Sequence, residues 1–269
     1  MIDKNEVADF YFNFRSPLVA LAIHNGNLLA DEVIDNIWIK ESERILDEEP
    51  YTEIFTGGFG NRVIVNSSRY QVDLDLPRDE SYYEEGLKCG ERFKIRDQLP
   101  MGYEITYSHS CHDFFYHDMQ WNINKLLKYF NAIFIYDFHS FNCFDLCGDL
   151  STPEPAPDII VGIENTAKIY FPLAVNLIEL IQNQDYDKRY LDVRLNFFLK
   201  GGYFSRWVKK EYGNRVCCIT VNINKGLFMD DILESVDEDK AGKIVNILDN
   251  TIEFLHKQIM YHYGSDHRI

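Results

Sequence analysis

The 269-residue sequence lacks several features that would assign it to a class at once. It has no apolar run as long as about 18 residues, so no segment is expected to span a membrane. Its first residues show no charged stretch followed by an apolar one, so no secretion signal is expected. Positive charge is scarce, with 27 Lys and Arg against 43 Asp and Glu and a formal net charge of −16. Because this charge repels phosphate backbones and anionic membranes, neither nucleic acid nor a membrane surface is an expected partner.

Short metal-binding and redox motifs are missing as well. The sequence contains no His-Glu-x-x-His and no Cys-x-x-Cys pair. Its six cysteines include the adjacent pair Cys217 and Cys218 in an apolar run, which is a poor arrangement for a structural bridge. A chain of this size needs no disulfide framework. We therefore expect reduced thiols and a cytoplasmic protein, and the sequence leaves its oligomeric state open.

The residues that are present predict an α/β fold. Short, nearly continuous apolar runs are typical of strands in a sheet that is covered on both faces, and they occupy residues 18–23, 62–65, 132–136, 158–161 and 216–221. Apolar residues recur with helical spacing over residues 113–130, 173–182, 203–212 and 237–261. Alternating strands and helices predict one three-layer sandwich over residues 1–269, with a mostly parallel or mixed central sheet and helices on both faces.

Polar side chains follow several of the predicted strands, namely His24, Arg69, His139 and Asn222. Ligands of α/β sheets bind at the carboxyl ends of the strands, so these residues are candidates for a site. Imidazole suits zinc, and a hydrolytic zinc site usually has three protein ligands. His24 and His139 could therefore bind a metal together with a carboxylate. The alternative is two histidines that are hydrogen-bonded at the edge of a sheet.

Six short motifs follow one another along the chain, namely His24-Asn-Gly, Ser68-Arg-Tyr-Gln-Val-Asp-Leu74, Tyr116-His117, Asp137-Phe-His-Ser140, Pro157-Asp-Ile-Ile-Val-Gly162 and Lys200-Gly-Gly-Tyr203. Their order resembles that of the N-formylglutamate amidohydrolase family, which is related in fold to zinc carboxypeptidases and aspartoacylase. The chain resembles this family over nearly its whole length. The resemblance implies a zinc-dependent hydrolase that cleaves the amide C–N bond of a small N-acyl acidic amino acid such as N-formylglutamate, in histidine catabolism.

The resemblance also assigns metal ligands. His24 and His139 would bind zinc, together with an acidic residue some 30 positions after the first histidine. Glu53 is the preferred third ligand, and Glu49 and Glu48 are its nearby alternatives.

Substrate-binding roles fall on cationic residues. Arg69 would grip a substrate carboxylate through two parallel hydrogen bonds, unless it forms a salt bridge with Asp73 or Asp75. Asp73 would orient a ligand histidine or hold Arg69. Two further cations are candidates. Arg78 would stand for the second arginine of the family if two residues are inserted, because Leu74-Asp-Leu-Pro77 replaces the Leu-Asn-Arg of the family. Lys200 lies in a glycine-containing loop that either meets an anion or forms a simple turn.

The catalytic positions differ from the family at one point. The last core strand of the family ends in a glutamate that deprotonates the attacking water, but this chain has Asn222 there, and an amide cannot accept that proton. Glu164 is the nearest alternative carboxylate, and His117 could carry a proton. Two other functions therefore remain open. One is a regulatory or ligand-binding protein that has lost its base, and the other is an amidase of different specificity, such as one for a peptide or cell-wall amide.

Overall fold

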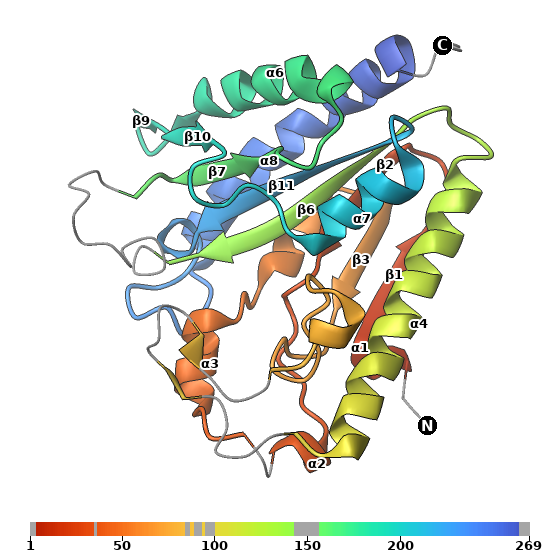
Figure 1. Ribbon diagram of the computed structural model, residues 1–269. Coiled ribbons are helices and arrows are strands. Elements are labelled where there is room, and N and C mark those ends of the chain that lie inside the picture. Colours follow the sequence, from red (N-terminus) through yellow and green to blue (C-terminus); the bar gives the residue numbers. More distant parts are fainter. Residues whose placement is uncertain are drawn as a thin grey trace.

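The computed structural model describes residues 4–34, 37–83, 87–88, 93–94, 100–142 and 156–263. Within these residues an open seven-stranded sheet has the order β1-β3-β2-β6-β11-β7-β10 (Figure 1). Its strands are β1 (Ala8–Phe12), β2 (Leu18–Ala22), β3 (Asn61–Val65), β6 (Ile133–Phe141), β7 (Ile159–Gly162), β10 (Val193–Leu195) and β11 (Val216–Asn224). β1 pairs with β3 and β11 with β7 in antiparallel fashion, and the other neighbours are parallel. The predicted mixed sheet is therefore confirmed.

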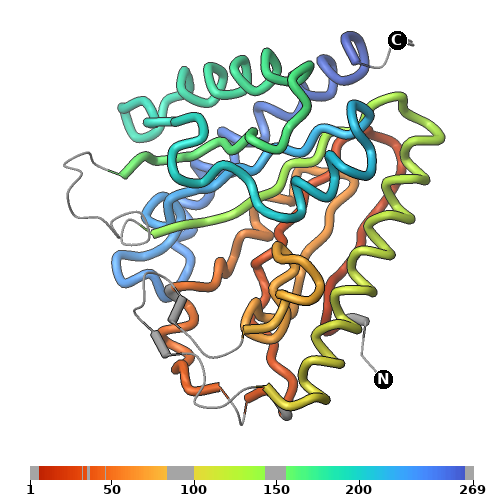
Figure 2. Tube along the Cα trace, in the orientation of Figure 1, coloured from red at the N-terminus to blue at the C-terminus, as the bar shows by residue number. Residues whose placement is uncertain are grey.

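Helices cover both faces of this sheet, as the ribbon and the tube show (Figures 1 and 2). One face carries α4 (Gly102–Leu126) and α7 (Tyr203–Tyr212), and the other carries α6 (Phe171–Gln182) and α8 (Glu238–Gln258). Because successive side chains of a strand point to opposite faces, β6 contributes to both layers of core. Ile135 packs in the cluster that contains α4 and α7, whereas Tyr136 packs in the cluster that contains α6 and α8. The three-layer sandwich is confirmed.

The central strands are buried along nearly their whole length, which is why their sequences read as continuous apolar runs. β6 continues to Phe141 and β11 to Asn224, beyond the predicted ends at residues 136 and 221. His139 and Asn222 consequently lie within the carboxyl-terminal parts of strands, and the expectation that they follow strand ends is wrong. The backbone pairing of β6 with β11 continues through these polar residues, and His139 is the register partner of Asn222.

Helix boundaries match the predictions unevenly. α6, α7 and α8 begin within two residues of the expected positions, and the Asp237 side chain caps α8 by accepting hydrogen bonds from the backbone N–H groups of Asp239 and Lys240 at 3.1 Å. α4 begins at Gly102, well before the predicted residue 113, and the side chain of Glu104 accepts a bond from the N–H of Met101 at 2.6 Å to close its first turn. No helix in the described ranges is long and apolar enough to cross a membrane.

The remaining elements are short. They are α1 (Lys4–Val7), α2 (Asp31–Ile34), α3 (Glu41–Asp47), β4 (Leu87–Lys88), β5 (Phe93–Lys94), β8 (Asp185–Tyr186), β9 (Arg189–Tyr190), the 3-10 turns Thr52–Thr56, Arg78–Glu80, Lys168–Tyr170 and Lys225–Leu227, and the π-helical end Ile259–Tyr263. Cys111, Cys217 and Cys218 are free and buried, in keeping with reduced thiols. Cys89, Cys143 and Cys147 lie outside the described residues.

Candidate active site

Two parallel neighbours in the sheet, β2 and β6, bring the two predicted histidines together. His24 lies two residues beyond the end of β2, and His139 lies two residues before the end of β6. Their rings are 5.2 Å apart between centroids, and the residues are only 4% and 6% exposed. The sequence prediction that these histidines meet at one edge of the sheet agrees with this geometry.

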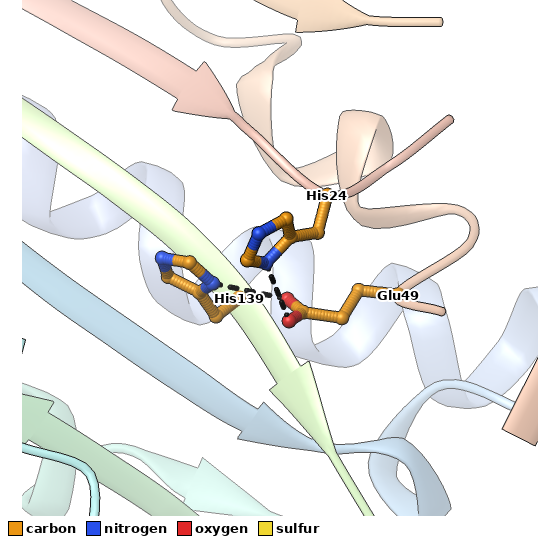
Figure 3. Close-up of side chains that lie close together, drawn as sticks. All are labelled: His24, Glu49 and His139. Carbon is orange, nitrogen blue, oxygen red and sulfur yellow. Dashed lines mark hydrogen bonds and ion pairs between the residues drawn. The ribbon is translucent and has the colours of Figure 1, made fainter. Parts of the chain in front are cut away.

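A carboxylate lies between the two rings (Figure 3). Glu49 follows α3, and its Oε1 lies 2.9 Å from Nδ1 of His24 while its Oε2 lies 3.1 Å from Nδ1 of His139. Its position is fixed by the backbone, because the N–H of Glu49 donates to the carbonyl oxygen of His24 at 3.3 Å and the N–H of Ser140 donates to Oε2 at 2.8 Å. Ligand atoms of all three residues lie within 4.8 Å of one another.

The outer nitrogen of each ring faces a second buried carboxylate. Nε2 of His24 is 3.0 Å from Oδ1 of Asp73, and Nε2 of His139 is 3.2 Å from Oδ2 of Asp137. Each imidazole therefore has one carboxylate on either side. Histidines that bind metals are commonly held in this way, with a carboxylate on the nitrogen that does not bind the ion.

The charged groups of this cluster shift one another's pKa values. Burial alone would lower the pKa of His139, but the charges of Asp137 and Glu49 outweigh it and hold that pKa well above its ordinary value. The pKa of His24 is raised too, because Glu49 and Asp73 outweigh burial and the charge of Arg69. Burial would raise the pKa of Glu49, but the two histidines hold it well below its ordinary range. The cluster thus attracts positive charge to the space between the rings.

These residues fit a divalent metal ion. Two imidazole nitrogens and one carboxylate oxygen are a common donor set of hydrolytic zinc sites. Asp137 is fully buried, and within the described part of the chain neither of its oxygens has a hydrogen bond of good geometry. A buried carboxylate in this state needs a cationic partner nearby, which an imidazolium or a metal-bound imidazole would provide.

The structure brings Glu49, rather than the preferred Glu53, to the histidines. Glu53 lies in the 3-10 turn that follows Tyr51, and it is not part of the cluster of possible ligands. Its N–H is bonded to the side chain of Asn25 at 3.1 Å, and its Oε2 is buried without a hydrogen-bond partner in the described ranges. Sequence spacing did not separate the two residues, because nothing in it shows that α3 ends at Asp47.

A cavity of about 380 Å³ opens beside the cluster. Arg69 and Lys200 both line it. Nη2 of Arg69 lies 3.1 Å from Oδ2 of Asp73, and Nη1 lies 3.6 Å from Oε1 of Glu49. Asp73 thus contacts both His24 and Arg69, the two residues that the sequence offered as its alternative partners. Arg69 forms no ion pair with Asp75 among the described side chains.

Asn222 also lines the cavity, beside His139. Its Nδ2 donates to the carbonyl oxygen of Ile160 at 3.2 Å, so the amide is anchored across the sheet to β7. An amide in this place can donate or accept a hydrogen bond, but it cannot accept a proton from water.

Three predicted site residues lie elsewhere. The side chain of His117 is 76% exposed on α4 and pairs with Asp118 at 3.0 Å, away from the cavity. Arg78 is exposed and bonds to Asp113 at 2.7 Å. Glu164 is exposed and is not among the residues that line the cavity. α4 turns His117 outward, and the loop after Leu74 carries Arg78 to the helix surface.

Sequence reasoning assigned no role to Asp137 or Tyr83. A signal existed for Asp137, since residues i and i+2 of a strand share a face and Asp137 precedes His139 by two. Tyr83 donates to Asp73 and accepts from Nε of Arg69 at 3.3 Å, a contact that no spacing predicts.

Comparisons with known proteins place the fold in a class. No family model matches the sequence, and no match was found among curated proteins. Among solved structures, N-formylglutamate amidohydrolase from Ralstonia eutropha superposes with a TM-score of 0.77 and 14% identity, covering 94% of this chain and 98% of the other. A gene product from Agrobacterium tumefaciens gives a TM-score of 0.57 at 12% identity, covering 94% and 97%.

These likenesses establish the fold. The chain is an α/β sandwich of the kind found in the Ralstonia eutropha N-formylglutamate amidohydrolase. This result agrees with the resemblance that the six sequence motifs indicate.

Proposed function

We propose that the protein is a zinc-dependent amidohydrolase that cleaves the amide C–N bond of a small N-acyl acidic amino acid, with N-formylglutamate as the leading substrate. The observation that carries the proposal is the cluster of His24, Glu49 and His139, in which each ring is held between two carboxylates. The shared fold with an enzyme of that name supports the substrate class.

The donor set determines the chemistry that is proposed. His24, Glu49 and His139 would hold zinc, and the ion, when bound, polarises an amide carbonyl and makes water more acidic. Asp73 and Asp137 would hold the two imidazole rings in the orientation that leaves each Nδ1 facing Glu49.

The cavity favours an anionic substrate despite the acidic chain. Arg69, with 17% of its side chain exposed, and Lys200 place two cations on the wall of the same cavity. An N-acyl glutamate or aspartate carries two carboxylates, and guanidinium binds such a group through two parallel hydrogen bonds. The two cations therefore give a reason for preferring an acidic amino acid over a neutral one.

The test is turnover by metal-free protein before and after one equivalent of zinc is added. We expect release of glutamate from N-formyl-L-glutamate only with zinc, and a kcat/KM at least tenfold higher than for N-formyl-L-leucine. Equal rates with and without zinc would rule out metal dependence. Preference for the neutral substrate, or for a peptide, would support an amidase of different specificity.

A second function is a binding protein without turnover, and Asn222 is the observation that favours it. In that case metal-free and zinc-loaded protein would both bind N-formyl-L-glutamate or glutamate in calorimetry, but neither would release product.

A further inference from the structure

The cavity needs a group that can accept a proton, because Asn222 cannot. Among the residues that line it, the acidic ones are Asp47, Glu49 and Asp75. Glu49 is engaged by both histidines, and Asp47 accepts a hydrogen bond from the hydroxyl of Tyr70 at 2.6 Å, whereas the backbone of Asp75 is bonded to Asp73, which contacts His24. Asp75 remains, and we propose that Asp75 is the catalytic base of this site. This assignment rests on the proposed amidohydrolase function.

One oxygen of Asp75 is fixed and the other is available. Oδ1 accepts a hydrogen bond from the backbone N–H of Phe204, in the first turn of α7, at 2.7 Å. Oδ2 has no hydrogen-bond partner within the described part of the chain, and no Lys or Arg there forms an ion pair with the carboxylate. A carboxylate held at one oxygen can accept a proton at the other without losing its position.

Gly202 makes room for this carboxylate. A methyl group in place of its hydrogen would collide with Oδ2 and Cγ of Asp75. Gly202 has φ −99°, so the backbone itself does not require glycine at this position. The absence of a side chain therefore serves the placement of Asp75 against the Lys200-Gly-Gly-Tyr203 loop.

Asp75 is also linked to the histidine cluster. Its backbone N–H donates to Oδ1 of Asp73 at 3.0 Å, and the same oxygen lies 3.0 Å from Nε2 of His24. Burial raises the pKa of Asp75 to about 6, although His139, His24 and the N–H of Phe204 act to lower it. The other ionisable groups that feel its charge are Asp137, Tyr116 and Cys218. A carboxyl group near this pKa is suited to taking and returning a proton around neutral pH.

The family resemblance also bears on Asp75. By the resemblance, Asp75 would stand at the asparagine of the family's Leu-Asn-Arg, and Asn222 would stand at its glutamate. Both residues line one cavity. The resemblance therefore implies that a carboxylate and an amide have exchanged places within this site.

In the proposed step, Asp75 transfers one proton from water to the leaving nitrogen. A water oxygen attacks the amide carbonyl carbon while one of its protons passes to Oδ2 of Asp75. When the C–N bond breaks, Asp75 returns that proton to the leaving nitrogen. The products are a carboxylic acid and a free amine, and Asp75 is again ionised.

The first test is Asp75→Asn, which keeps an oxygen to accept the bond from Phe204 and removes only the proton acceptor. We expect kcat to fall by about 10²–10⁴-fold, the usual contribution of a general base, with KM and zinc affinity changed by less than about threefold. Asp113→Asn is the matched control, because Asp113 pairs with exposed Arg78 outside the cavity, and it should retain parental kcat. A kcat for Asp75→Asn within threefold of the parent would overturn the assignment.

Two further variants separate chemistry from folding. Asp75→Asn combined with Asn222→Glu returns the carboxylate to the other wall and should recover at least tenfold of the lost kcat. Gly202→Ala should displace the Asp75 carboxylate and lower kcat while zinc still binds, whereas Gly242→Ala, with open space around its α carbon, should not. Full activity of Gly202→Ala in a correctly folded protein would contradict the role of Oδ2.

A readout without turnover keeps the two proposals apart. Infrared titration of metal-free protein should show a carboxyl band that is absent from Asp75→Asn and has a midpoint near pH 6. If the parent hydrolyses no N-acyl amino acid, the proposed function fails, and this titration still decides whether Asp75 is a proton acceptor poised near neutral pH. A midpoint below about pH 5 would overturn that.

Discussion

At the scale of single residues, the proposed metal site depends on the orientation of two imidazole rings. Each ring turns Nδ1 toward Glu49 and Nε2 toward a buried aspartate, Asp73 for His24 and Asp137 for His139. A histidine pair that only stabilised the sheet edge would need one hydrogen-bond partner per ring. The double arrangement instead fixes the orientation of both rings, with each Nδ1 toward Glu49, which is the arrangement expected of ligand histidines.

We expect substrate preference to depend most on Arg69. Arg69→Lys keeps the positive charge but loses the planar pair of donors, so we expect KM for N-formyl-L-glutamate to rise about 10–100-fold, in line with roughly 1.5–3 kcal/mol for a hydrogen bond to a charged group. Zinc content should stay unchanged, as measured by elemental analysis.

The control for Arg69 is Arg78→Lys, since Arg78 is exposed and bonds to Asp113 at the helix surface. It should keep the parental KM. If Arg69→Lys instead lowers the melting temperature and leaves KM unchanged in the folded fraction, Arg69 serves only its ion pairs with Asp73 and Glu49.

Residues that belong to the sequence motifs came together more often than residues placed by distance along the chain. His24, His139, Arg69 and Lys200 line one cavity. Glu53 was preferred over Glu49 because the family offers only an approximate distance along the chain there. The selection depends on the backbone bond between Glu49 and His24, which a single sequence does not reveal.

At the scale of elements, the parallel register of β6 and β11 aligns His139 with Asn222 across one edge of the sheet. The buried strands and the helices α6, α7 and α8 were predicted because their apolar residues follow the expected periods. β1 and β10 were missed because they lie at the two edges of the sheet, where exposed positions weaken the apolar pattern. The polar first half of α4 hides its helical period, which is why its start was placed 11 residues late, at residue 113 instead of 102.

For the whole molecule, the net charge of −16 does not predict the charge of the cavity, because positive and negative side chains are unevenly distributed over the fold. Arg69 and Lys200 give the cavity cationic walls, while Glu49, Asp73 and Asp137 surround the histidines. From this separation of charge we expect the stability of the protein to depend on pH and, if the proposed site binds zinc, on the metal.

The stability of metal-free protein should fall as pH rises above about 6.5. The folded state raises the pKa of both His24 and His139, so their contribution to stability is fully present below the unfolded value of 6.5 and is lost as pH passes through the folded values. Bound zinc replaces those protons, so zinc-loaded protein should not show this loss. Each kcal/mol corresponds to about 2–4 °C of melting temperature in a domain of 150–250 residues, which calorimetry from pH 6 to 9 can resolve. An identical pH dependence with and without zinc would contradict this linkage.

Zinc titration of the metal-free protein by calorimetry tests the metal centre most directly, with Glu49→Gln and Glu53→Gln as a matched pair. Both variants remove one carboxylate charge from the same short segment, but only Glu49 lies between the histidines. We predict one zinc per chain for the parent, an affinity within about threefold of it for Glu53→Gln, and a loss of more than about 100-fold for Glu49→Gln, beyond the 10–100-fold typical of residues that only orient a ligand. Unchanged zinc binding by Glu49→Gln, or the loss appearing in Glu53→Gln instead, would contradict the site built from His24, Glu49 and His139.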